Sequence, residues 1–157
     1  MKILKKALVF TLIGASAVLV ACSKDDDDKK TTNIASRNGL VFSPANERPV
    51  VTTSTATGTA NVSFDKTTKV LTYTLNWSGL SDSLTGSHIH GTSSKEASSG
   101  VKVGFTLPRG SLSGNYSGTA QVDGVLIKED SLLKGFYYFN LHTKKNPGGE
   151  IRAQIEF

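Results

Sequence analysis

The stretch "VLTYTLNWSGL", residues 70–80, decides the fold class of this chain. Its apolar members Leu71, Tyr73, Leu75 and Trp77 stand at every second position, with Thr and Asn residues between them. Successive side chains of a strand point to opposite faces, so this period of two predicts a β-strand with one face in the core. We expect Trp77 to anchor that core.

The same alternation recurs elsewhere in the chain. Four further segments place apolar side chains on one expected inner face: Ala60, Val62 and Phe64; Val101, Val103, Phe105 and Leu107; Tyr116, Ala120 and Val122; Ile151, Ala153, Ile155 and Phe157. In the last segment, the residues expected to point outward are Glu150, Arg152, Gln154 and Glu156. The segment "FYYFNLH", residues 136–142, is apolar on both faces, which is typical of a central strand.

One segment has a helical pattern, at Lys128–Lys134, and Gly135 behind it fits a helix C-terminus. About seven short strands with Gly, Ser and Asn turns predict an all-β domain over residues 38–157. We expect an antiparallel β-sandwich or a partly open Greek-key barrel. About 120 residues suit one domain with one core.

The N-terminus predicts where the protein is located. Lys2, Lys5 and Lys6 precede an apolar stretch that is too short to span a membrane comfortably, which is typical of a secretory signal peptide over residues 1–21. "LVAC", ending at Cys22, has the form of a lipobox, and Cys22 is the only cysteine in the chain. A single thiol has no disulfide partner, so we expect Cys22 to be lipidated. The mature chain would then be tethered to a membrane without spanning it.

An acidic run, Asp25–Asp28, follows the cysteine. Residues 22–37 contain few large apolar side chains and are expected to form a flexible tether. The run is similar to the export signal of surface lipoproteins, which predicts the outer membrane and possible display on the cell surface. The net charge of +5 falls to +2 without the three lysines of the signal peptide, which argues against a nucleic-acid partner.

All three histidines are candidates for a metal site. His88 and His90 stand two residues apart in "GSHIHGT", and His142 lies in "YFNLHTKK". On a strand, residues i and i+2 share a face about 6.5–7 Å apart, so both imidazoles can address one ion. His142 would complete the set if its strand lies alongside. Three histidines with an open position would suit copper or zinc.

Three motifs also occur in order: "FSPANERPVVTTSTATGTA" (residues 42–60), "LTYTLNWSGLSDSLTGSHIHG" (71–91) and "LLKGFYYFNLHTKKNPGGEIRAQI" (132–155). Together they resemble the CHRD domain, named after chordin, over roughly residues 40–157. Two departures are mild: Arg48 precedes Pro49 in the first motif, and Ala153 stands where the family usually has Gly. The resemblance implies an immunoglobulin-like β-sandwich. In bacteria it implies a secreted or anchored protein without an assigned activity.

Two functional hypotheses remain open at this point. In the first, the lipoprotein is a non-enzymatic binding or structural module with an extracellular protein or glycan partner. The histidines then belong to a hydrogen-bonded polar cluster with Asn140, Glu150 and Arg152. In the second, His88, His90 and His142 bind one copper or zinc ion, with metal-dependent redox chemistry left open. Copper–zinc superoxide dismutase also uses a His-x-His on a β-sandwich, but its full site needs more histidines than this chain has.

Overall fold

The computed structural model describes residues 33–107 and 109–157. Eight strands form two four-stranded sheets, and every neighbouring pair is antiparallel. The first sheet has the order β1-β2-β3-β6, with β1 at Ile34–Phe42, β2 at Thr57–Asp65, β3 at Val70–Ser78 and β6 at Gly114–Gln121. The second has the order β5-β4-β7-β8, with β5 at Val101–Gly104, β4 at Leu84–Gly91, β7 at Tyr137–Thr143 and β8 at Ile151–Gln154.

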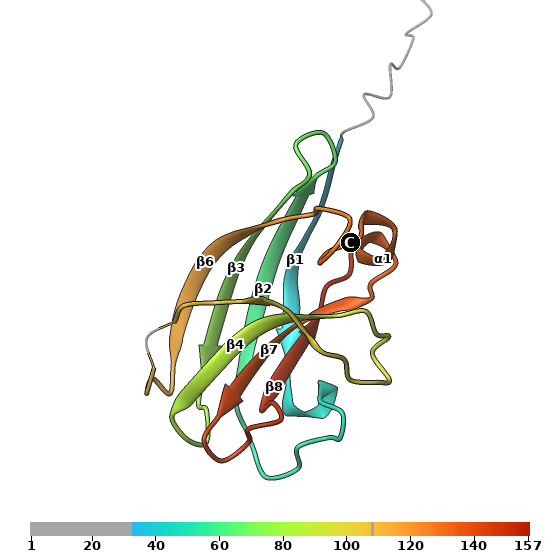
Figure 1. Cartoon of the computed structure of the whole chain (residues 1–157). Helices are drawn as coiled ribbons and strands as arrows, with labels where there is room; N and C mark the ends of the chain where they lie inside the picture. The colour runs from blue at the N-terminus through green and yellow to red at the C-terminus, as the bar shows by residue number, and fades with distance from the viewer. Residues whose placement is uncertain (1–32, 108) are drawn as a thin grey trace, which may run out of the picture. The chain divides into compact units, whose positions relative to one another are not determined.

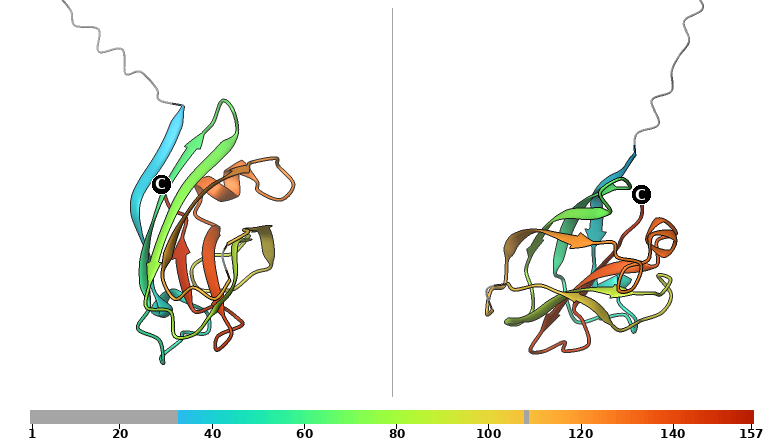
Figure 2. Two further views of the ribbon diagram at one scale, coloured as in Figure 1. Left: turned by 90° about the vertical axis from the view of Figure 1, so that its left-hand side faces the viewer. Right: turned by 45° about the horizontal axis from the view of Figure 1, so that its top comes forward.

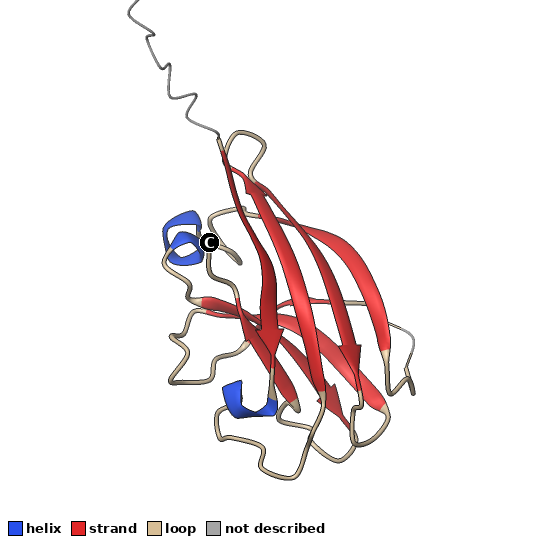
Figure 3. Ribbon diagram, turned by 180° about the vertical axis from the view of Figure 1, so that it is seen from behind, coloured by secondary structure: helices blue, strands red, loops and turns tan. Residues whose placement is uncertain are grey.

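The two sheets pack face to face as a β-sandwich (Figures 1 and 2). The sandwich was one of the two predicted architectures and is confirmed. Two short helices accompany it, the 3-10 helix η1 at Pro44–Asn46 and α1 at Glu129–Leu133, and they lie toward opposite ends of the strands (Figure 3). The predicted helix near 128–134 is therefore present. Within residues 33–107 and 109–157, no helix is long and apolar enough to cross a bilayer.

The predicted inner faces meet between the sheets. Leu71, Leu75 and Phe64 are fully buried, and Trp77 is 5 % exposed. Strand β7 is buried along its whole length between β4 and β8, as expected of a central strand. Its inner residue Phe139 packs against rings from both sheets. Burial of this apolar surface is the main driving force for folding, since the described residues contain no disulfide.

Val101 does not point into the core, contrary to expectation, and is 52 % exposed. The pairing of β4 with β5 slips by one residue: Ile89 faces Val103, whereas His90 faces Val101. The extra residue, Lys102, forms a β-bulge, and beyond a bulge the alternation of faces is reversed. Val103, Phe105 and Leu107 keep the predicted contact with the core.

Two further expectations need correction. Strand β1 begins at Ile34, so residues 34–37 belong to the folded domain and not to the tether. Asn33 is also described, and residues 22–32 of the predicted tether, including Cys22, lie outside the described residues, as does the signal peptide. Arg152 does face away from the core, but it is 1 % exposed, because the loop that holds Ser94 and Ala97 covers that side of the second sheet. Glu150 precedes β8 and does not point outward: it is 0 % exposed and bonds to Ser54 and Ser81, in loops beside the first sheet.

Glu150 joins several loops at one end of the sandwich. Its carboxylate accepts hydrogen bonds from the hydroxyls of Ser54 (2.6 Å), Ser81 (2.9 Å) and Thr143 (2.6 Å), the backbone N–H of Ser81 (2.7 Å) and the amide of Asn146 (3.2 Å). Burial alone would raise the pKa of Glu150, but these hydrogen bonds together outweigh it and lower the pKa. The ionised carboxylate therefore stabilises the fold.

We predict that Glu150→Gln lowers the free energy of unfolding by about 3 kcal/mol at pH 7, because charged acceptors of buried donors are lost. Since the folded pKa lies below the ordinary value of 4.5, the stabilisation is complete above that pH and is lost as the pH falls. The difference in the free energy of unfolding between wild type and Glu150→Gln, measured by urea titration, should therefore shrink below pH 4.5. Glu129→Gln, at the partly exposed ion pair with Lys69, is the control and should cost about 1 kcal/mol or less. Equal costs for the two variants would contradict this account.

Candidate metal centre

The outer face of the second sheet carries the three histidines. In the pairing of β4 with β7, His88 faces Asn140, His90 faces Tyr138, and Gly86 faces His142. Directly paired residues project to the same face, so β4 and β7 bring the three imidazoles together. The absence of a side chain at Gly86 matters here, because a Cβ atom at that position would lie 3.0 Å from Cε1 of His88.

The three imidazoles converge. One nitrogen from each of His88, His90 and His142 lies within 4.8 Å of the other two. The ring centroids are 4.8 Å apart for His88 and His142, and 5.4 Å apart for each of the other pairs. Spatial proximity of the two histidine segments, expected from their motifs, is what the structure shows.

Two of the rings are held by backbone carbonyls. Nδ1 of His90 lies 2.8 Å from the carbonyl oxygen of Ser99, and Nδ1 of His142 lies 3.0 Å from that of Pro147. A carbonyl oxygen only accepts, so each Nδ1 must carry the proton and donate it. In the neutral ring, the other nitrogen, Nε2, is then an unprotonated acceptor. This arrangement, with the outer N–H fixed to a carbonyl, is the usual support of a metal-ligating histidine.

The two unprotonated nitrogens face each other. Nε2 of His90 and Nε2 of His142 are 3.3 Å apart. With both Nδ1 protons committed, neither Nε2 has a proton to donate, so two lone pairs point at one another unless a cation lies between them. Tetrahedral zinc with bonds of about 2.0–2.1 Å would hold two nitrogens roughly 3.3–3.4 Å apart. The spacing therefore fits a shared metal ion.

His88 supplies the third imidazole. Its Nδ1 is buried and has no hydrogen-bond partner among the described residues. An unpartnered buried nitrogen costs free energy, which a bound cation would remove. His88 also lines a cavity of about 210 Å³ together with Phe105 and Arg109, so this cavity lies directly beside one of the three imidazoles.

The electrostatics of the cluster keep the imidazoles neutral. Burial, together with the nearby His142 and His90, lowers the pKa of His88 to about 4. Burial also lowers the pKa of His90 and of His142, although their hydrogen bonds to carbonyls oppose the shift. Neutral imidazole is the form that binds metals, so no proton has to be displaced at pH 7.

Tyr138 and Arg152 support His90 from the side. The ring of Tyr138 stacks on His90 with centroids 5.1 Å apart and planes 13° apart. From β8, on the other side of β7, the guanidinium carbon of Arg152 lies 3.6 Å from the centre of the Tyr138 ring. The Tyr138 hydroxyl accepts from the N–H of Ser99 at 3.0 Å, which fixes the loop whose carbonyl holds His90.

The residues expected to form a polar cluster with the histidines bond elsewhere. Asn140 donates to Glu47 at 3.3 Å, and Arg152 donates to the carbonyls of Ser94 and Ala97. Glu150 belongs to the separate loop network described above. None of these three side chains hydrogen-bonds to a histidine within the described part of the chain.

Glu47 was not foreseen as part of this polar layer. It is 3 % exposed, and burial raises its pKa to about 7 despite the positive charge of Arg152. The carbonyls of Ser99 and Pro147 also escaped prediction, since a backbone carbonyl leaves no signal in the sequence. The sequence signal that did point to this site was the alternation of His88 and His90 with Ile89, which places both imidazoles on one face of a strand.

The fold and the site define an antiparallel β-sandwich that carries three converging histidines on the outer face of one sheet. A scan against protein-family models matches the CHRD domain over residues 40–155, which include all three histidines. The chain therefore belongs to the CHRD domain family. Searches of curated proteins and of solved structures gave no match.

We predict that His88 titrates with a midpoint near pH 4 in the metal-free protein, because burial and its two neighbouring imidazoles disfavour its charged form. Ring-proton chemical shifts followed by NMR from pH 3 to 9 would measure this. The unfolded value is near 6.5, so these neutral histidines favour the fold fully above that pH and progressively less below it. A midpoint at 6.5 would show that the three rings do not share a buried site.

Proposed function

We propose that this CHRD domain is a non-enzymatic binding module whose ligand is a single copper or zinc ion, held by His88, His90 and His142. The opposed Nε2 atoms of His90 and His142, each with its Nδ1 proton committed to a carbonyl, are the observation that carries this proposal. A purely structural cluster of histidines would be expected to pair donors with acceptors. In His90 and His142 the Nδ1 donors point outward to carbonyls, and the Nε2 acceptors point toward each other.

The donor set restricts the choice of metal. Among the described residues, the group of possible metal ligands consists of the three histidines, without an Asp, Glu or Cys. Imidazole suits copper and zinc, whereas calcium and magnesium require oxygen ligands. Three nitrogen donors leave one coordination position for water or for a ligand that enters through the cavity beside His88.

We further propose that the domain acts outside the cytoplasm, anchored to the outer membrane through lipidated Cys22. Support comes from the three lysines before the apolar stretch and from the lipobox-like "LVAC". Histidines in such a compartment can meet extracellular metal directly. An anchored module would act by capturing or holding the ion at the membrane surface.

The first test is metal titration of the chain that begins at Ser23. We expect one copper or zinc ion to bind per chain by calorimetry, and His90→Ala to weaken binding by at least about 100-fold, because one of three ligands is lost. Ser87→Ala is the matched control. It removes an unpartnered buried hydroxyl next to His88 on the opposite face of β4. Its affinity should equal that of the wild type. Absence of stoichiometric binding of either metal at micromolar concentration would refute the metal proposal.

The second test addresses the anchor. Mass spectrometry of the full chain expressed in a Gram-negative host should show a mature N-terminus at Cys22 with the added mass of acyl chains. Cys22→Ser should release the protein from the membrane fraction, since a hydroxyl cannot take the thioether-linked lipid. A mature protein that begins at another residue would contradict the anchor.

A further inference from the structure

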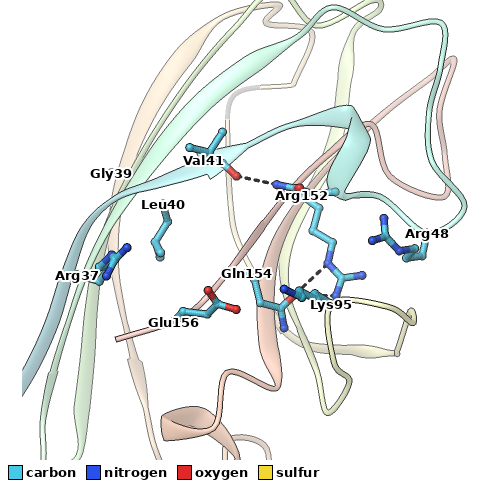
Figure 4. Close-up of a pocket in the computed structure, with 10 residues that line it drawn as sticks. Arg37, Gly39, Leu40, Val41, Arg48, Lys95, Arg152, Gln154 and Glu156 are labelled. Atoms are coloured by element: carbon cyan, nitrogen blue, oxygen red, sulfur yellow. Dashed lines mark hydrogen bonds between the residues drawn. The ribbon is translucent and has the colours of Figure 1, made fainter.

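A second concave site lies between the open edges of the two sheets. β1 and β8 are end strands of their sheets, and a groove of about 270 Å³ lies where they run beside each other (Figure 4). Asn46 joins the two edges, because its amide donates to the carbonyls of Val41 at 3.0 Å and Arg152 at 3.1 Å. No histidine lines this groove, so it is distinct from the metal centre.

The groove has an excess of positive charge. Its lining includes four cationic side chains, Arg37, Arg48, Lys95 and Arg152, against one carboxylate, Glu156. Arg48 pairs with Glu96 at 3.2 Å. The other ion pair in the described part of the chain joins Lys69 to Glu129, so the remaining three cations of the groove have no carboxylate partner. Cations gathered in a concave site attract anions more strongly than the same charges spread over a convex surface.

Arg152 gives the groove a rigid cationic wall. Its side chain is among the most buried in the domain, and its guanidinium rests on Tyr138. It donates to the Gln154 amide oxygen from Nε and Nη2, to Ser94 from Nη2 and to Ala97 from Nη1. A guanidinium has five N–H groups, so one on Nη1 is left without an acceptor in the described part of the chain. Burial lowers the pKa of Arg152, and the nearby Tyr138 and Glu47 only partly oppose that shift.

Arg37 places a second cation at an unusual position. It pairs with Val62, a core residue, so it occupies the inner face of β1 at the open side of the sandwich. Between Arg37 and Leu40 the register of β1 slips, and Gly39 adopts φ +72° with open space around it. No side chain therefore projects from the chain at Gly39, close to Arg37, which leaves room for a ligand.

We propose that this groove binds a small organic anion that carries two or more carboxylate groups. The unpaired cations Arg37, Lys95 and Arg152 come from three separate segments, and one carboxylate lines the groove against them. A net excess of two positive charges, three minus one, matches a ligand with at least two negative charges. The volume of the groove suits a small molecule rather than a folded partner. Inward-pointing cations also protect free sheet edges from pairing with other chains, and this is the competing explanation.

Citrate is the probe, titrated by calorimetry into the metal-free chain that begins at Ser23, at low ionic strength. The double variant Arg37→Gln/Lys95→Gln should weaken binding about tenfold, because two exposed charges facing the anion are lost. Both side chains are exposed and make no hydrogen bond to another described residue, so the fold should be kept, which thermal melting would check. Lys134→Gln/Lys145→Gln removes the same charge from exposed sites outside the groove and should leave the affinity unchanged.

Sulfate at matched ionic strength is the second arm of the experiment. Citrate should bind more tightly than sulfate in the wild type, and the difference should vanish in Arg37→Gln/Lys95→Gln. Equal binding of both anions would overturn the carboxylate assignment. Absence of citrate binding at millimolar concentration, or equal weakening by the two double variants, would overturn the site and leave edge protection as the role of the cations. Both arms use metal-free protein, so neither outcome depends on the metal proposal.

Discussion

The antiparallel pairing of β4 with β7 is the constraint on which the rest of the structure depends. It sets Ile89 opposite Phe139 in the core, and it sets His88 and His90 opposite Asn140 and Tyr138 on the outer face. Because side chains of a strand alternate between faces, a slip of one residue would carry the imidazoles into the core and the apolar residues out of it. The same strand register therefore determines both the core and the histidine cluster.

The outer face differs from that of an ordinary sandwich because it is both polar and covered. Buried polar groups must be satisfied, and four of the five N–H groups of Arg152 are: they donate to the carbonyls of Ser94 and Ala97 and to the amide oxygen of Gln154. Among the described residues, Nδ1 of His88 and Oδ1 of the directly paired Asn140 lack partners, and so do Oε1 of Glu47 and the hydroxyl of Ser99. Each unsatisfied buried group calls for an explanation, and the proposed metal ion would provide one for His88.

Much of the fold followed from the period of two, which predicts the inner residues of β2, β3 and β8. The central place of β7 followed instead from apolar residues on both of its faces. The exposure of Val101 did not follow, since a β-bulge depends on pairing with another strand. Burial of Arg152 also escaped prediction, because a charged residue on an outer face is normally solvated, and only the covering loop changes that. For the site, the residues of the cluster could be named from the sequence. Which nitrogen of His90 and of His142 carries the proton could not be predicted, because it is set by the carbonyls of Ser99 and Pro147.

The carbonyls of Ser99 and Pro147 bear on which residues of the protein can vary during evolution. A carbonyl is present at every position of a chain, so the anchors of His90 and His142 do not depend on which amino acids stand at 99 and 147. The hydroxyl of Ser99 has no partner among the described residues, which fits an anchor supplied by backbone alone. The loops above the centre can therefore vary in sequence, and acquire new surfaces for recognition, while the geometry beneath them is retained. Only the backbone conformation of these loops has to be retained, because it places the two carbonyls against His90 and His142.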